Sequence, residues 1–141
     1  MKAYLSFLII SIFLLCSCNS VKKDPSKNTS GSIIEFEATT FDFGKIAFGS
    51  DGSCVFRFTN TSETPLMINK VRTSCGCTNP SWYKDPVEQG KSGEIFIKYN
   101  TQIPGKFQKS ITVFSNAVNS PVKLLIKGEV EPDPSVSSTN Q

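Results

Sequence analysis

Apolar and polar side chains alternate with period two along the middle of this 141-residue chain. The alternation is clearest over residues 54–59, 94–100 and 121–127. Weaker examples cover residues 33–38, 41–46, 66–71 and 108–115, and clusters rich in Gly, Pro and Asn separate the segments. Alternate side chains of a strand share one face, so the pattern predicts half-buried antiparallel strands.

About seven short strands within about 98 residues predict an all-β domain, an Ig-like antiparallel β-sandwich. We expect this domain to span residues 33–130. An antibody-type domain would also carry a disulfide between its two sheets, and no cysteine follows Cys77. The expected sandwich is therefore Ig-like without that bond.

Residues 1–17 have the pattern of an export signal, in which one lysine precedes an apolar run over residues 3–15. As a helix this run would rise about 20 Å, short of the roughly 30 Å hydrocarbon core, which favours a signal peptide over a membrane span. It ends in Leu15-Cys16-Ser17-Cys18, which resembles the bacterial lipobox and marks Cys18 as the diacylated first mature residue. Cys16 fits that role poorly, because bulky Leu15 precedes it. The alternative is a soluble secreted protein whose cysteines carry no lipid.

The segments on either side of the domain are polar. Residues 18–32 are expected to hold the lipidated cysteine and a flexible tether, and residues 131–141 a disordered tail. A lipid anchor places the protein in the cell envelope, with the membrane as one partner. Asn19 stands where an inner-membrane retention signal would have aspartate, so we expect the outer membrane, facing the periplasm or the surface.

Composition narrows the functional classes. The absence of histidine excludes Ser-His-Asp and Cys-His catalysis and removes the commonest zinc ligand. The 15 Lys+Arg and 12 Asp+Glu residues give a net charge of +3, too balanced to indicate a nucleic-acid partner. We expect no enzyme, no cofactor and no small-molecule substrate.

Four stretches, 41–46, 56–62, 71–78 and 90–95, together resemble the bacterial domain-of-unknown-function family 1573. The most specific of them contains Ser-Cys-Gly-Cys-Thr, and the resemblance covers roughly residues 34–129. That family consists of secreted and lipid-anchored proteins with an Ig-like sandwich, similar to domains of cilium and centrosome proteins and to the major sperm protein. It has no established catalytic activity, so the resemblance implies a fold more than a function.

Three positions in these stretches have predictable backbone roles. Gly44 suits a positive φ where the first long strand turns away. Asn60 can hydrogen-bond its own backbone and end a strand, and residues 90–93 suit a turn.

Cys75-Gly76-Cys77 is the one motif with possible chemistry, and three interpretations compete. The two sulfurs form a reducible disulfide with each other. Or they are thiolates that bind Cu(I) or zinc, with Cys54 or Met67 as further ligands if the fold brings them close. Or the pair is structural, through a bond from Cys54 to one of them or as buried thiols. The absence of histidine counts most strongly against the metal.

Trp82 and Tyr83 lie in a stretch that reads as a long loop between strands. Such side chains either cover the open end of the sandwich or contact a partner protein. We therefore expect a lipid-anchored envelope protein that acts as a non-enzymatic binding or structural module, and take Trp82 and Tyr83 as candidate contacts. The alternative function is a periplasmic thiol-redox or copper-handling protein that uses Cys75 and Cys77.

Overall fold

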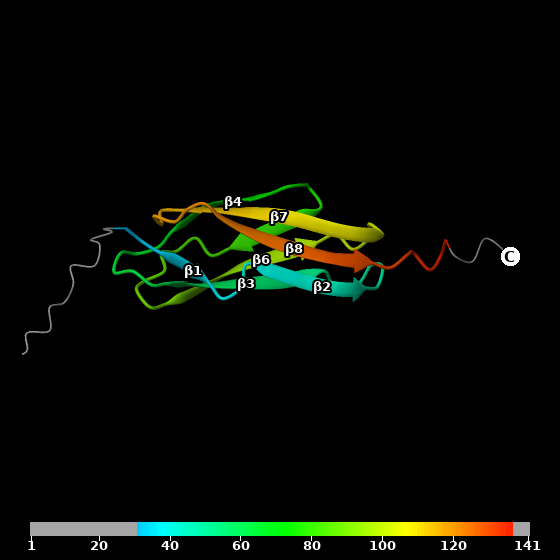
Figure 1. Ribbon diagram of the computed structural model, residues 1–141, viewed down its shortest axis with the longest axis horizontal. Coiled ribbons are helices and arrows are strands. Elements are labelled where there is room, and N and C mark those ends of the chain that lie inside the picture. Colours follow the sequence, from blue (N-terminus) through cyan, green and yellow to red (C-terminus); the bar gives the residue numbers. More distant parts are fainter. Residues whose placement is uncertain (1–30, 137–141) are drawn as a thin grey trace, which may run out of the picture.

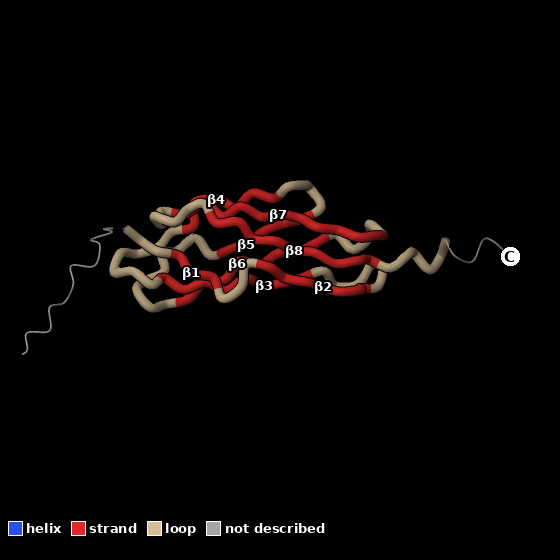
Figure 2. Tube along the Cα trace, in the orientation of Figure 1, coloured by secondary structure: helices blue, strands red, loops and turns tan. Residues whose placement is uncertain are grey.

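The computed structural model describes residues 31–136, which form strands joined by turns and loops (Figures 1 and 2). Nothing in this part of the chain is a helix that could cross a membrane. The strands are β1 (Ile34–Phe36), β2 (Thr40–Ile46), β3 (Ser53–Asn60), β4 (Ile68–Thr73), β5 (Thr78–Trp82), β6 (Ser92–Tyr99), β7 (Gly105–Ser115) and β8 (Val122–Val130).

The strands form two four-stranded sheets, in the orders β1-β3-β6-β5 and β2-β8-β7-β4. The predicted β-sandwich is confirmed. Five of the six pairings given by the strand registers are antiparallel, as predicted, but β2 pairs with β8 in parallel. The parallel pair arises because the chain changes sheets between Phe36 and Thr40, which brings β2 alongside the last strand.

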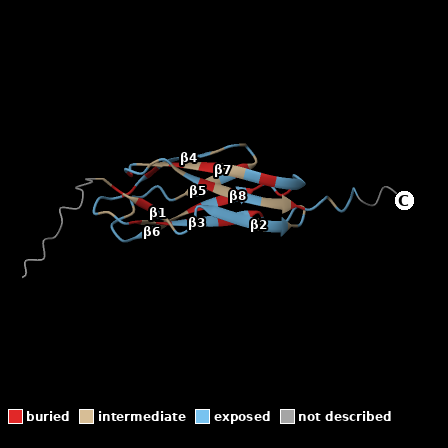
Figure 3. Cartoon of the chain, in the orientation of Figure 1, coloured by how far each residue is buried: buried red, intermediate tan, exposed pale blue. Residues whose placement is uncertain are grey.

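The period-two pattern corresponds to the core. Cys54, Phe56 and Phe58 of β3 are buried, and they pair with buried Ile97, Ile95 and the small Gly93 of β6. The same strands therefore alternate between buried and exposed residues along their length (Figure 3). Burial of one face of each sheet is what holds the two layers together.

Asn60 ends β3, as predicted. Its Nδ2 donates to the carbonyls of Thr64 and Val87, both at 2.8 Å, and its Oδ1 accepts the Ser62 N–H at 3.0 Å. The side chain is fully buried, so these bonds satisfy groups that water does not reach. The positive φ expected at Gly44 is also confirmed, at 63°.

One strand, β5, was not predicted. It runs through residues that the sequence assigns to a loop, because Pro80 and its polar neighbours hide the alternation. With β5 included, the described residues contain eight strands rather than about seven.

The strand register also fixes the two ends of the sandwich. β3 pairs through Asn60 with Ile34, close to where the described chain begins. At its other end, Ser53 pairs with Lys98, which pairs in turn with Asn79 of β5. The turn before β5 therefore lies at the opposite end of the sandwich from Ile34.

Candidate functional site

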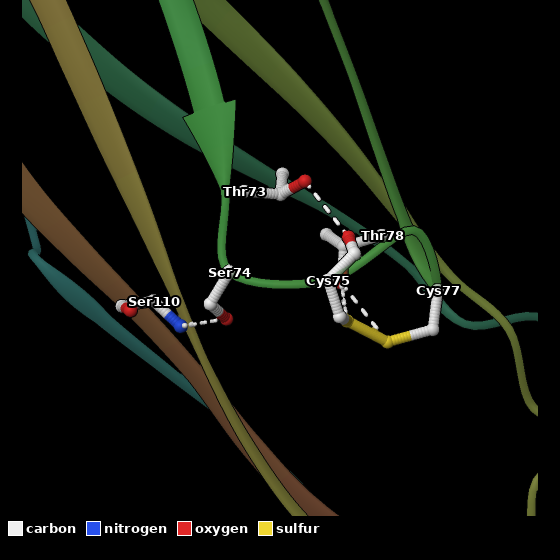
Figure 4. The surroundings of a disulfide bond; sticks show 6 residues. All are labelled: Thr73, Ser74, Cys75, Cys77, Thr78 and Ser110. Carbon is white, nitrogen blue, oxygen red and sulfur yellow. Dashed lines mark hydrogen bonds between the residues drawn. A yellow bond between two sulfur atoms is a disulfide. The ribbon is translucent and has the colours of Figure 1, made fainter.

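The turn between β4 and β5 carries the two cysteines of the predicted site. The chain leaves one sheet at Thr73 and enters the other at Thr78, and the sulfurs of Cys75 and Cys77 are joined in a disulfide across Gly76 (Figure 4). Their Cα atoms are 5.4 Å apart, within the ordinary range for a disulfide. Of the three interpretations of this motif, the structure shows the disulfide between Cys75 and Cys77.

Hydrogen bonds hold this turn on both sides of the disulfide. Thr73 Oγ1 donates to the Cys75 carbonyl at 2.9 Å, and the Asn100 N–H donates to the Cys77 carbonyl at 2.9 Å. The Ser110 N–H donates to Ser74 Oγ at 3.2 Å (Figure 4), and the Ser74 N–H donates to the Ser110 carbonyl at 3.0 Å. The main chain of the turn is therefore fixed by contacts that do not involve sulfur.

Cys54 does not take part in a disulfide, so the interpretation in which it bonds to Cys75 or Cys77 is wrong. It is a buried free thiol of β3. Strand β6 lies between β3 and β5, so two interstrand spacings, about 10 Å, separate Cys54 from even the nearest part of β5, more than a disulfide spans. Burial raises the pKa of the Cys54 thiol to about 11, so it stays protonated and unreactive at neutral pH.

The structure brings no further ligands to the predicted metal site. Within residues 31–136, no three His, Cys, Asp or Glu side chains are placed to hold a metal ion. Cys54 faces the core and Cys75 and Cys77 are bonded to each other, which leaves no thiolate pair in this state. The nearby guanidinium of Arg72 lies over the Phe114 ring, 5.7 Å from its centroid. Cys18, the predicted lipid site, lies outside the described residues.

Trp82 and Tyr83 point in opposite directions, because the alternation of β5 continues through them. Trp82 packs against the core, and its Nε1 donates to the Ile68 carbonyl at 3.2 Å. The Lys84 ammonium lies over the Trp82 ring, 3.1 Å from its centroid. Trp82 therefore closes the side of the sandwich between β4 and β5, rather than its open end as one interpretation of the sequence had it.

Tyr83 is 74% exposed and lies on the outer face of the β1-β3-β6-β5 sheet. Two apolar side chains that were not predicted as contacts share this face: Val55, 39% exposed, and Phe96, 38% exposed, are paired across β3 and β6. Phe96 also pairs with Ser81, two residues before Tyr83. The only sequence signal for Val55 and Phe96 was that each is apolar at a position where the period-two pattern expects a polar residue.

An ion pair borders this apolar surface. Arg57 Nε and Glu94 Oε1 are 2.9 Å apart. These two residues pair across β3 and β6, two positions along from the Val55–Phe96 pair and on the same face. Arg57, Glu94 and Tyr83 line a shallow hollow together with Glu37. We call Val55, Tyr83 and Phe96, with the Arg57–Glu94 pair, the outer apolar face.

The edges of the first sheet are blocked against an added strand. In β1, which has three residues, the Asn119 amide accepts the Ile34 N–H at 3.2 Å and donates to the Ile34 carbonyl at 2.8 Å. In β5, the Asn100 N–H donates to the Cys77 carbonyl, so the backbone groups of Cys77 point towards β6. Because backbone groups alternate in direction along a strand, those of Pro80 point to the free edge, where proline has no N–H to donate.

The edges of the second sheet are interrupted as well. The register of β2 shifts between Asp42 and Lys45, around Gly44, and that of β4 shifts between Ile68 and Lys70. Such irregularities twist an edge away from a neighbouring chain. Each of the four edge strands is therefore short, capped or interrupted, so none offers a long regular edge to another strand.

Comparison with known proteins agrees with the fold. In sequence, no curated protein matches the chain. A solved protein of unknown function from Porphyromonas gingivalis W83 superposes with a TM-score of 0.64 at 17% identity over 76% of this chain, which spans about half of that protein (51%). The ASH/PapD-like domain 7 of human CEP192 gives 0.62 at 10% identity, over 78% of this chain and 94% of that one. At these identities the likeness is one of fold.

The sequence stretches that resemble family 1573 lie within one continuous match. The model of the family described as "Protein of unknown function (DUF1573)" matches residues 34–130, from the first residue of β1 to the last residue of β8. This match covers more than half of the chain and includes the Cys75–Cys77 turn and the outer apolar face. The chain belongs to the DUF1573 family.

Proposed function

We propose that this chain is a lipid-anchored protein of the cell envelope whose sandwich domain binds another envelope protein and catalyses no reaction. The lipobox that ends at Cys18 and the polar stretch that follows it support the anchor. The absence of histidine, and of a candidate metal cluster in residues 31–136, supports a non-catalytic role.

The outer apolar face is the observation that carries the binding part of this proposal. Val55, Tyr83 and Phe96 remain exposed although the opposite face of their sheet is well buried. Apolar side chains that gather on a sheet face, bordered by charges, are typical of protein interfaces. Tyr83 is a suitable anchor, because a tyrosine contributes a large contact area and a hydroxyl.

The charges beside the outer apolar face indicate which kind of partner surface would fit it. Arg57 and Glu94 compensate each other and stay solvent-accessible, so the face has no strong field of one sign. A protein surface with an apolar centre and a mixed polar rim would fit it, whereas a polyanion would not.

Cross-linking in intact cells, followed by purification of the full chain, tests the binding role. Tyr83→Ala and Phe96→Asn should each reduce the recovery of a cross-linked envelope protein. Ile103→Ser is the matched control, since Ile103 is 45% exposed in the loop between β6 and β7. Equal recovery from all four proteins, the unaltered chain included, would contradict binding through this face.

Mass spectrometry of the mature chain tests the anchor separately. We expect a diacylglyceryl group on Cys18 at the amino terminus, and Cys18→Ala should abolish both the lipid and the cleavage. Cys16→Ala is the matched control and should be processed normally. A mature terminus at another residue would refute the anchor without affecting the binding experiment.

A further inference from the structure

The Cys75–Cys77 disulfide lies in a turn at the surface of the domain. Both cysteines are half-buried, Cys77 packs against the core, and Gly76 between them is exposed. Apart from its two neighbours, Cys75 and Cys77, no atom lies within 4 Å of a methyl group built on Gly76, so no other segment covers the turn at this point. Another protein can therefore reach this turn from the side of Gly76. Exposed disulfides are the ones that exchange with thiols most readily.

The turn would keep its shape if the disulfide opened. The carbonyls of Cys75 and Cys77 accept bonds from Thr73 and Asn100, which lie outside the ring. The two thiols of the reduced form would therefore remain close together, ready to form the bond again.

A buried hydroxyl lies behind the two sulfurs. Thr78 Oγ1 is 3.8 Å from Cys75 Sγ and 3.9 Å from Cys77 Sγ, and the residue is only 2% exposed (Figure 4). A disulfide sulfur carries no hydrogen, so the hydroxyl is the donor in this contact. The same donor would stabilise a thiolate released at either position, because a hydrogen bond to the charged form favours that form.

From these three features we propose that Cys75 and Cys77 form a thiol–disulfide exchange site whose partner is a protein dithiol. A thiolate of the partner attacks one sulfur, the Cys75–Cys77 bond breaks, and its electron pair leaves on the other sulfur, which takes up a proton. The partner's second thiol then attacks the mixed disulfide. The partner ends as a disulfide and this chain as a dithiol, so two electrons and two protons have moved. The proposal does not depend on the outer apolar face or on the anchor.

Reduced thioredoxin, used as the protein dithiol, tests the exchange on the folded full chain. After incubation without denaturant and alkylation with N-ethylmaleimide, peptide mass spectrometry should find adducts on Cys75 and Cys77 and none on buried Cys54. The circular dichroism spectrum should stay unchanged. Adducts that form only after urea unfolding, or adducts accompanied by loss of the fold, would overturn the proposal.

Two substitutions at Thr78 test the hydroxyl. Thr78→Val removes the donor and keeps the branched shape, and it should slow exchange by about threefold or more, the effect of losing one hydrogen bond to the thiolate. Thr78→Ser keeps the hydroxyl and should exchange at a rate close to that of the unaltered chain. Equal rates for the Val and Ser variants would refute the role of Thr78 in stabilising the thiolate.

Discussion

The size of the ring closed by the Cys75–Cys77 bond limits how much this bond can stabilise the fold. The bond joins residues only two positions apart, so the ring contains three residues. The loop-closure entropy of such a ring is about 5.4 cal/mol/K, which corresponds to about 1.6 kcal/mol at 25 °C, whereas a 100-residue loop would give about 4.7 kcal/mol. The hydrogen bonds that fix the turn remain when the sulfurs are replaced.

We therefore expect a chain with both Cys75→Ser and Cys77→Ser to lose about 1.6 kcal/mol of unfolding free energy. Urea unfolding followed by tryptophan fluorescence measures this loss, because Trp82 is the single tryptophan and packs against the core. The midpoint should fall by about 1 M urea for a domain of this size.

Dithiothreitol provides the control for this measurement. It should move the unaltered chain to the midpoint of the double variant and leave the double variant unchanged. A loss above about 3 kcal/mol would refute the reasoning, because a three-residue ring cannot supply that much through chain entropy. The bond would then be a main structural support.

Three further predictions concern the core. Asn60→Ala should lower the unfolding free energy by about 3 kcal/mol in urea, since two carbonyls lose the Nδ2 donor that serves them; a loss below about 1 kcal/mol would contradict this. Gly93→Ala should cost about 1–3 kcal/mol in the same assay, because a Cβ there would lie 2.5 Å from the buried Phe58 ring, and a neutral effect would show that the ring moves aside. Between pH 9 and about 11, the unfolded Cys54 thiol ionises while the folded one stays protonated, so stability should fall as pH rises, by about 2 kcal/mol. Cys54→Ala should remove that part of the pH dependence, and identical pH profiles for the two proteins would refute it.

The strands that bury one face were predictable because burial leaves a period-two record in the sequence. Cys54, Phe56 and Phe58 show it in β3, and Ile95, Ile97 and Tyr99 show it in β6. β5 left no such record, because it lies at a sheet edge and contains Pro80 and polar residues. Its pairing with β6 came from the fold of the whole domain rather than from its own composition.

The sequence alone was equally unable to predict which way Trp82 and Tyr83 point. Trp82 and Tyr83 are adjacent in sequence and looked equivalent as loop residues, but a strand places neighbouring side chains on opposite faces. Trp82 consequently packs inward and Tyr83 points outward. Val55 and Phe96 are 41 positions apart and are paired by the register of β3 with β6, while the register of β6 with β5 puts Phe96 beside Ser81, two residues before Tyr83.

By itself, the sequence determined the class of fold, the family and the lack of histidine chemistry, because these depend on local periodicity, motif spacing and composition. It left open which of Cys54, Cys75 and Cys77 are bonded. The tertiary structure decided that question, because β6 separates Cys54 from β5 while the β4–β5 turn holds Cys75 and Cys77 together. Pairings between distant segments are set by the register of the sheets, which no local stretch of sequence encodes.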